Sequence, residues 1–313
     1  MSLSIFKLEY LLNYNKEKLV ISWIAVDWGT SSFRAYLIKN NKVLDQVISK
    51  DGMKFVKQNN FEISFIKLIE KWFVPNKKIL VLASGMLGSR QGWAEAPYEN
   101  VPCNLDKLKF ISPLTKDNRF ELKIYSGVAQ NNPPDVMRGE ETQVAGFFYE
   151  NSNFIGSICL PGTHSKWINV NKSRIENFKT YMTGELFEVI SQNTVLIHSL
   201  NCKQIDKLEF LKSVDLIIEK PEAFSGMLFQ LRADDLINNQ LSIKSRSRLS
   251  GYLLGLELAG SIDAWNKKDV VIIGNQELTE LYSDALNNKV SSLKQCNSEE
   301  MILKGLTYFK SFL

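Results

Sequence analysis

The sequence contains one pattern twice: a short apolar run, a glycine-containing turn, an alternating run, a second turn and a third strand-like run. The first copy is IAVDWG at 24–29, SSFRAYLI, a turn at Asn40–Asn41 and KVLDQVIS. The second copy is FIGSICLPGTHS at 154–165, KWINVN, a turn at 171–173 and RIENFKTYMTG. Alternating apolar residues are typical of strands, and asparagine tolerates the left-handed backbone of tight hairpins. Two meanders, each followed by helices, indicate a duplicated α/β unit.

The remaining elements follow from apolar spacing. We expect strands in KKILVLASGM, DVVIIG and LKIYSG, the last ending just before a loop NNPPD, and helices in FEISFIKLIEKWF, EAFSGMLFQLRADDLI, SRLSGYLLGLELAGSIDAW, QELTELYSDAL and MILKGLTYFKSFL. A chain of 313 residues can form two domains, each with its own core. We expect an N-terminal extension at 1–20, a first domain at 21–150 and a second at 151–313, with a hinge near Glu150 to Asn153. The last helix is expected to pack back on the structure, with the first domain as one place for it.

Composition excludes several classes of protein. A net charge of +4 with interspersed signs does not suggest a nucleic-acid partner. The apolar stretches are shorter than the ~20 residues of a membrane helix, and no signal segment opens the chain, so we expect a cytoplasmic protein with no membrane partner. Four separated cysteines and two histidines predict neither a zinc site nor a disulfide framework. A homodimer is left open.

The first turn carries residues suited to a metal-bound phosphate. Asp27 ends an apolar strand and is followed closely by Gly29, Thr30 and Ser31. Such a carboxylate can hold Mg²⁺ through water, while the turn directs backbone N–H groups and hydroxyls at phosphate oxygens. Both features suit ATP. The alternative is an aspartate that caps a hairpin whose turn contains Ser and Thr.

The equivalent turn of the second copy contains Gly162, Thr163, His164 and Lys166. Two such hairpins facing one another across a cleft would hold a triphosphate from both sides, with Lys166 or His164 meeting its charge. In the alternative, Gly162 only makes the turn and Lys166 is solvated. No P-loop or Rossmann fingerprint occurs to support another nucleotide fold.

Between the two copies lies Arg138-Gly139-Glu140-Glu141-Thr142-Gln143, with acidic residues where a helix begins. One carboxylate could accept the proton of an attacking hydroxyl, and Arg138 could bind an anionic substrate. Acidic residues also complement the dipole of a helix start, which is the structural alternative.

A glycine-rich segment, GMLGSRQGW at 85–93, follows a buried strand and has the composition of a binding loop. We expect Gly88 and Ser89 to contact substrate there. Trp93 and Tyr98 could flank a sugar, or they could be buried aromatics that anchor a surface loop.

Five segments, DWGTSSFRAYL, GMLGSRQGWAEAPY, VMRGEETQ, LPGTHSKW and YMTGEL, in this order resemble the 2-dehydro-3-deoxygalactonokinase family. The resemblance extends from about Ile24 to the C-terminus. It implies phosphorylation of the 6-hydroxyl of 2-dehydro-3-deoxy-D-galactonate in galactonate catabolism, with ATP and Mg²⁺. It also implies an α/β fold of two ribonuclease-H-like, actin- and hexokinase-like ATPase domains around a central cleft.

The resemblance assigns roles by position. It places Asp27 near Mg²⁺, Gly29, Thr30 and Ser31 at the phosphates, and LPGTHSK at the second phosphate segment. VVIIGNQEL resembles an adenosine segment, with Gly274 and Asn275 at the nucleotide, although it lacks the usual glycine pair. Glu141-Thr142 stands where relatives have the Asp-Thr pair of the catalytic base, so Glu141 is the first candidate, with Glu140 and Asp27 as further catalytic candidates.

For the substrate carboxylate, Arg138 is the first candidate ligand, with Arg34 and Ser89 as further ones. Two alternatives to this reading stay open. One is a kinase of the same fold acting on another sugar acid or sugar, and the other is a non-catalytic, actin-like nucleotide-binding protein. The paired acids beside a binding loop favour catalysis.

Overall fold

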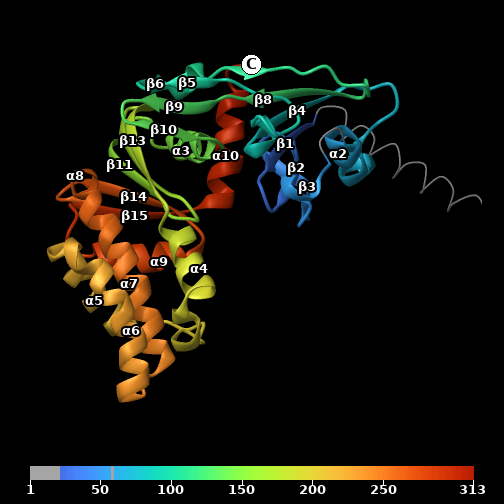
Figure 1. The fold of residues 1–313 in the computed structure, drawn as a ribbon. Helices are drawn as coiled ribbons and strands as arrows, with labels where there is room; N and C mark the ends of the chain where they lie inside the picture. The colour runs from blue at the N-terminus through green and yellow to red at the C-terminus, as the bar shows by residue number, and fades with distance from the viewer. Residues whose placement is uncertain (1–21, 58–59) are drawn as a thin grey trace, which may run out of the picture. The chain divides into compact units, whose positions relative to one another are not determined.

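The computed structural model describes residues 22–57 and 60–313, and the chain divides into two compact units (Figure 1). Unit 1 comprises the described residues up to Asn153 together with Glu299–Leu313, and unit 2 is Phe154–Ser298. The extension expected at 1–20 lies outside the described residues. The second domain was expected to span 151–313, with the first domain as one place for its last helix to pack, and the structure groups the last fifteen residues with unit 1.

Unit 1 is built on a six-stranded sheet in the order β3-β2-β1-β4-β8-β7. Strands β1, β2 and β3 are antiparallel neighbours, β4 and β8 run parallel to β1, and β7 is antiparallel to β8. The bounds are β1 (Trp23–Trp28), β2 (Phe33–Lys39), β3 (Lys42–Ser49), β4 (Ile79–Ser84), β7 (Phe110–Ile111) and β8 (Phe120–Tyr125).

A smaller sheet in the order β10-β9-β5 and three helices complete unit 1. These elements are β5 (Tyr98–Asn100), the short strand β6 (Cys103–Asn104), β9 (Gly127–Asn131), β10 (Pro134–Met137), α2 (Phe61–Ile69), α3 (Glu140–Phe148) and α10 (Ser298–Lys310). Helix α10 packs within unit 1, since Phe309 stacks on Tyr125 with ring centroids 4.4 Å apart and Lys304 pairs with Glu150 at 2.7 Å.

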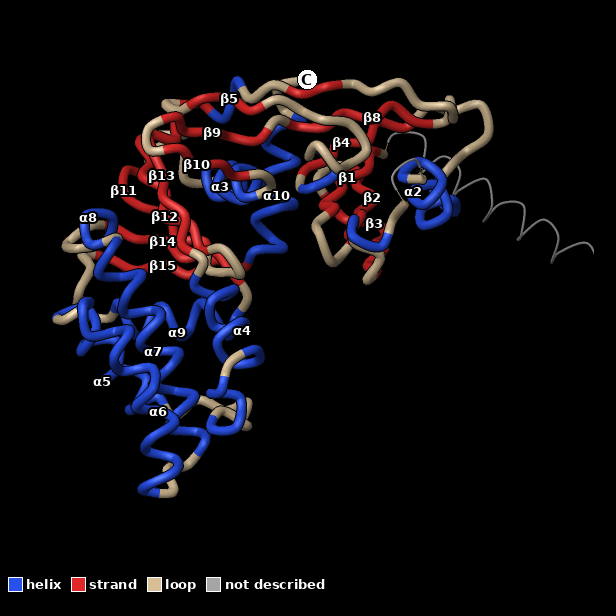
Figure 2. Tube along the Cα trace, in the orientation of Figure 1, coloured by secondary structure: helices blue, strands red, loops and turns tan. Residues whose placement is uncertain are grey.

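Unit 2 repeats the topology with a sheet in the order β13-β12-β11-β14-β15. Its strands are β11 (Ile155–Leu160), β12 (Ser165–Asn171), β13 (Arg174–Tyr181), β14 (Asp269–Gly274) and β15 (Ser292–Asn297). Its helices are α4 (Thr183–Asn193), α5 (Lys207–Glu219), α6 (Phe224–Asn238), α7 (Ser242–Gly260), α8 (Ile262–Trp265) and α9 (Gln276–Leu286), which Figure 2 colours blue.

The five strands β3-β2-β1-β4-β8 and β13-β12-β11-β14-β15 match in order and direction, so the predicted duplication is confirmed. The second turn of each meander is also equivalent. Asn40 and Asn41 have φ of 50° and 58°, and Lys172 and Ser173 have φ of 48° and 51°. Two consecutive left-handed residues make the turn whose twist matches that of paired strands.

Each unit has its own core. In unit 1 the rings of Trp28, Phe33, Phe65, Trp93 and Phe120 form an edge-to-face cluster under the sheet. In unit 2, apolar side chains of the sheet pack against α5, α7 and α9, and a second cluster fills the space among α4, α6 and α7. In the described part of the chain, no helix has the length and apolar character needed to cross a membrane.

Two local predictions were wrong, and some elements were not predicted. The loop predicted after LKIYSG is a hairpin of β9 and β10, because the chain pairs again on both sides of residues 132–133. The helix predicted over 247–265 begins earlier, at Ser242, and breaks at Ser261, whose ψ of 17° ends α7 before α8 begins. Helix α5 and strand β15 were not predicted at all.

Candidate functional site

The first predicted phosphate turn connects β1 and β2 and is held by the segment that follows β3. Gly29 N–H donates to the carbonyl of Ser32, at 3.0 Å. The carbonyls of Gly29 and Thr30 accept from the backbone N–H groups of Met53 and Lys54, at 3.0 and 3.1 Å. Thr30 and Ser31 are exposed. The turn therefore has a fixed backbone and presents two hydroxyl side chains to solvent.

Asp27 lies beside this turn as a largely buried carboxylate. Arg34, its register partner on β2, pairs with it at 3.1 Å and also contacts Glu299 at 3.2 Å. Burial raises the pKa of Asp27, and Glu299 and Glu140 add to the rise, while Arg34 opposes it. Arg34, predicted as a substrate ligand, is thus engaged by two carboxylates.

Asp27 is also close to the turn at the end of β4. Gly85 has φ of 97°, and a Cβ there would lie 2.9 Å from the carbonyl oxygen of Trp28 and 3.2 Å from Oδ1 of Asp27. Gly139, before α3, approaches Gly85 in turn, since its own Cβ would lie 3.4 Å from the Cα of Gly85. The structure therefore brings together the first turn, the glycine-rich loop and the start of α3.

Arg138 is buried beside the glycine-rich loop, with 9% of its surface exposed. Its Nη2 donates to the carbonyl of Ala96 at 2.8 Å, and its guanidinium lies 4.2 Å from the ring centre of Tyr98. A Cβ on Gly88 would come within 2.9 Å of Nη1. Nη1 itself is buried without a hydrogen-bond partner among the described residues. An unpaired buried guanidinium nitrogen is costly, so this position suits an anionic ligand.

The two acids of α3 have different surroundings. Glu141 is 1% exposed, and its carboxylate accepts from Gly139 N–H at 2.7 and 2.9 Å. Burial, and secondarily the charge of Glu140, raises the pKa of Glu141 to about 8. Glu140 is half-buried, and its Oε2 accepts from Arg138 N–H at 2.9 Å. Glu140 is therefore the more accessible of the two to a substrate hydroxyl.

The loop at 85–93 folds tightly, and Trp93 N–H donates to Leu87 O at 2.8 Å. Trp93 packs 6.5 Å from Trp28 and 5.7 Å from Phe65, between ring centres. Its predicted role beside a sugar is thus not supported, because the ring anchors the loop to the core, which is the alternative that the sequence left open. Ser89 is buried, and its hydroxyl has no hydrogen-bond partner among the described residues.

A cavity of about 380 Å³ in unit 1 brings Thr30 and Ser89 together. Thr30 comes from the first turn and Ser89 from the glycine-rich loop, which lie 59 residues apart in the sequence. The other residues that line this cavity are Met53, Lys54, Val56, Met86 and Gln91.

The second predicted phosphate turn lies between β11 and β12, against the start of α4. A Cβ on Gly184 would meet the carbonyl oxygen of Gly162 at 2.4 Å, and Glu185 N–H donates to Thr163 O at 3.0 Å. Nothing lies within 4 Å of a Cβ built on Gly162. Glycine at 184 therefore allows the helix start to approach the turn, a contact that explains the YMTGEL motif.

The two cations predicted beside this turn both have partners. Lys166 is buried on β12, and its Nζ donates to Thr180 Oγ1 at 2.7 Å. His164 is exposed and its Nε2 contacts the carboxylate of Glu185. Lys166 is therefore not the solvated lysine of the alternative interpretation.

The predicted adenosine segment is adjacent to this turn. Because β11 and β14 are parallel, their carboxyl ends meet at one edge of the sheet, and a Cβ on Gly274 would lie 3.2 Å from the ring of Pro161. Asn275 caps α9, with its side-chain oxygen accepting from Leu278 N–H at 2.9 Å. Gly162 and Gly274, far apart in the sequence, thus lie at the same end of unit 2.

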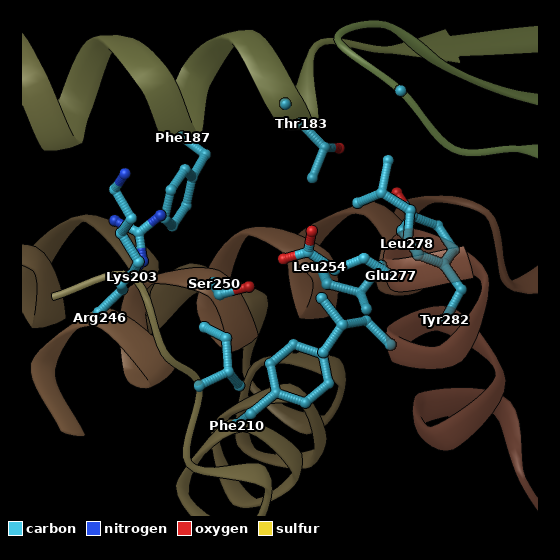
Figure 3. A pocket seen from close by; sticks show the side chains of 14 residues that line it. Thr183, Phe187, Lys203, Phe210, Arg246, Ser250, Leu254, Glu277, Leu278 and Tyr282 are labelled. Atoms are coloured by element: carbon cyan, nitrogen blue, oxygen red, sulfur yellow. The ribbon is translucent and has the colours of Figure 1, made fainter. Parts of the chain in front are cut away.

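A pocket of about 160 Å³ opens at this end of unit 2 (Figure 3). Phe187, Lys203 and Arg246 gather at one side, apart from Thr183, and Gly162 also lines the pocket. The other lining residues are Gly184, Ile205, Phe210, Ser250, Leu254, Glu277, Leu278, Leu281 and Tyr282. The lining is mainly apolar, with a few polar groups, which is the usual character of a small-molecule or cofactor site.

Most of these lining residues were missed by sequence analysis. Phe187, Arg246 and Leu281 look like ordinary residues of amphipathic helices, and their convergence depends on tertiary packing. The YMTGEL motif could have directed attention to Thr183 and Gly184, since it lies at a helix start directly after a meander.

Comparison with known proteins shows the family of this chain. A model of the 2-keto-3-deoxy-galactonokinase family matches residues 27–309. The chain belongs to this kinase family. A probable 2-dehydro-3-deoxygalactonokinase, DgoK1, of Rhizobium meliloti is 34% identical over 91% of this chain and 95% of that protein. The 2-dehydro-3-deoxygalactonokinase of Escherichia coli is 28% identical over 84% of this chain and 88% of its own length.

The fold prediction is confirmed as well. A crystal structure described as a 2-dehydro-3-deoxygalactonokinase protein from Sinorhizobium meliloti matches with a TM-score of 0.84 and 33% identity, over 92% of this chain and 95% of that one. Component A of the (R)-2-hydroxyglutaryl-CoA dehydratase of Acidaminococcus fermentans shares the fold alone, with a TM-score of 0.50 and 14% identity over 93% and 99% of the two chains. Family and fold together indicate an enzyme that uses ATP.

Proposed function

We propose that this protein transfers the γ-phosphoryl group of ATP to the 6-hydroxyl of 2-dehydro-3-deoxy-D-galactonate, a step of galactonate catabolism. Membership of the kinase family supports the reaction. The observation that carries the choice of a sugar acid is Arg138, a buried arginine whose Nη1 has no partner among the described residues. A carboxylate placed there would pair that nitrogen, whereas a neutral sugar would leave it unpaired.

In this proposal the substrate carboxylate binds Arg138, near Gly88 and Ser89. The hydroxyl that is phosphorylated points towards Glu140, which takes its proton. We assign the proton acceptor to Glu140 in preference to Glu141, because the carboxylate of Glu141 faces the backbone of Gly139. Glu141 then fixes the turn that carries both Arg138 and Glu140.

Each of the two turns is proposed as a phosphate-binding segment for the nucleotide. Gly29, Thr30 and Ser31 form the segment in unit 1, and Gly162 and Thr163 form the segment in unit 2. Phosphoryl transfer depends mainly on positioning and on neutralising charge. The adenine ring of ATP occupies the unit 2 pocket, at the end of that unit where Gly274 and Asn275 lie.

Mg²⁺ fits the residues next to the first turn. In the described part of the chain, no three His, Cys, Asp or Glu side chains gather into a metal-binding cluster. Mg²⁺ commonly binds through one or two carboxylates together with phosphates and water, and Asp27 supplies such a carboxylate. The ion would neutralise phosphate charge, and Arg34 would hold the Asp27 side chain in place.

The test compares ADP release with 2-dehydro-3-deoxygalactonate, its gluconate epimer and glucose. We expect turnover with the sugar acids and little with glucose, because glucose leaves Arg138 unpaired. Equal rates with all three compounds would contradict a sugar-acid kinase. ADP release that is the same with and without any sugar would instead favour the non-catalytic or actin-like alternative.

A further inference from the structure

A buried acid in unit 2 takes no part in the proposed chemistry. Glu257 lies on α7 with 2% of its surface exposed. Its Oε1 accepts from the indole N–H of Trp167 at 2.8 Å. Its Oε2 accepts from the hydroxyl of Tyr282 at 2.9 Å and from the hydroxyl of Thr183. One carboxylate thus receives three donors, from β12, α9 and the start of α4.

These donors belong to the walls of the nucleotide pocket. Thr183 and Tyr282 both line it, and they approach it from different helices (Figure 3). Trp167 lies on β12, two residues after Ser165, which is the first strand residue after the second phosphate turn. Ser165 is itself linked to the network, since its hydroxyl lies 2.8 Å from that of Tyr282.

The direction of the hydrogen bonds follows from the chemistry of the groups. An ionised carboxylate can only accept, so Trp167, Tyr282 and Thr183 all donate to Glu257. Tyr282 then has no proton left for Ser165 and accepts from it. Burial raises the pKa of Glu257, and the three donors oppose that rise. Ser165 therefore donates to Tyr282 and Tyr282 donates to Glu257. Glu257 is the final acceptor of this chain of hydrogen bonds, which begins beside the phosphate turn.

We propose that Glu257 is a positioning residue that holds the phosphate turn, the start of α4 and α9 in the arrangement that binds the nucleotide. The inference rests on the proposed nucleotide pocket of unit 2. Glu257 touches no ligand itself, and it acts through Thr183 and Tyr282 on the pocket and through Trp167 and Ser165 on the turn.

Glutamine is an informative replacement because it keeps the size of the side chain. Its amide has one oxygen and one NH₂ group, so a donor now faces either Trp167 or the two hydroxyls. In either orientation the three hydrogen bonds lose their charged acceptor. Where the NH₂ group faces the hydroxyls of Thr183 and Tyr282, these can keep their bonds only by accepting instead of donating, which reverses the proton order towards Ser165. We expect Glu257→Gln to raise the Kd for ADP about 10-fold or more, as expected for a lost hydrogen bond to a charged group. The KM for ATP should rise with it, while the KM for the sugar acid and the kcat at saturating ATP stay near wild type.

The matched control is Glu209→Gln, a second substitution of glutamate by glutamine in the same unit. Glu209 on α5 pairs with Arg248 of α7 at 3.0 Å, and neither residue lines the pocket. Glu209→Gln should lower the melting temperature and leave the Kd for ADP unchanged. If Glu257→Gln behaves in the same way, Glu257 is a stabilising residue only and the inference is overturned.

Two further variants cover the case in which Glu257→Gln does not fold. Tyr282→Phe keeps the ring and removes the link between Ser165 and Glu257, so it should weaken ADP binding; unchanged affinity overturns the inference. Glu257→Asp restores an acceptor, and its affinity should lie between those of Glu257→Gln and wild type. Calorimetry with ADP on the wild-type protein separates the proposed nucleotide pocket from the proposed role of Glu257. A wild-type protein that does not bind ADP contradicts the pocket itself, whatever the variants do.

Discussion

The turn after β1 and the turn after β11 occupy the same place in two copies of one topology, yet their surroundings differ. The penultimate residue of the strand before the turn is Asp27 in β1 and Cys159 in β11. Asp27 pairs with Arg34, whereas Cys159 lies opposite Trp167 in an apolar core. Beside the turn, unit 1 thus holds a charged pair, whereas unit 2 holds part of its apolar core. If both turns bind the nucleotide as proposed, we expect the shared backbone to set where each turn meets it and the side chains to set which part of it each turn binds.

The largest expected effect tests the charged site of unit 1. Glu140→Gln should lower kcat about 100-fold or more, because an amide cannot accept the proton of the attacking hydroxyl. The Kd for ADP, measured by calorimetry, should not change, since the proposed pocket for the adenine ring lies in unit 2. Glu141→Gln serves as the matched control. Loss of turnover in Glu141→Gln with normal turnover in Glu140→Gln would return the role of base to Glu141.

The second prediction tests Arg138 of unit 1 as the ligand of the substrate carboxylate. Arg138→Met should lower kcat/KM for the sugar acid about 30-fold, because a carboxylate loses its charged partner. Arg138→Lys should recover only part of this loss, since lysine lacks the planar fork that matches a carboxylate. Steady-state kinetics at fixed ATP provides the measurement. A rise in the KM for ATP alone would show that Arg138 serves the nucleotide instead.

On the unit 2 side, the sharpest probe is Gly184. Its Cβ would lie 2.4 Å from the carbonyl oxygen of Gly162, so Gly184→Ala must displace the phosphate turn. We expect the KM for ATP to rise about 10-fold, with the KM for the sugar acid unchanged, as for loss of one charge-assisted contact. Gly226→Ala is the matched control, because Gly226 lies in α6 with open space around it. Equal kinetics in the two variants would remove the turn from nucleotide binding.

The smallest expected effect concerns stability and pH. The pKa of Glu141 is raised from 4.5 to about 8, so the folded state holds this proton more tightly than the unfolded state does. The resulting stabilisation is complete below the unfolded pKa and is lost as the pH rises through about 8. Glutamine at 141 has no such proton. The melting temperature of wild type minus that of Glu141→Gln should therefore fall between pH 5 and pH 9, and a difference that is constant with pH would contradict the buried acid.

Much of the fold could be predicted because its signals are local. The strands around Asp27 and Gly162 are short apolar runs ended by turn residues, and the hairpins at Asn40 and Lys172 use residues that accept positive φ. Strand β15 escaped prediction because SLKQCN is largely exposed and polar, so it lacks the alternation of a half-buried strand.

The candidate residues could be named from the sequence only where they lie in or next to a glycine-containing turn. Asp27 and Arg138 lie within two residues of Gly29 and Gly139, and Gly162 is itself a turn glycine. Trp93 was assigned to a ligand because sequence does not show on which side of a loop a ring packs. Glu257 has no local signal, since a single acid in a helix of mixed character usually faces solvent and its three partners lie on other elements.

The return of helix α10 to unit 1 has a consequence for biosynthesis. Unit 2 is contained in one uninterrupted stretch of chain, whereas unit 1 needs a segment that is translated after unit 2. Domains generally fold as units during synthesis, so unit 2 has all of its residues available while unit 1 still waits for the stacking partner of Tyr125. The unit whose synthesis begins before that of the other is thus completed after it.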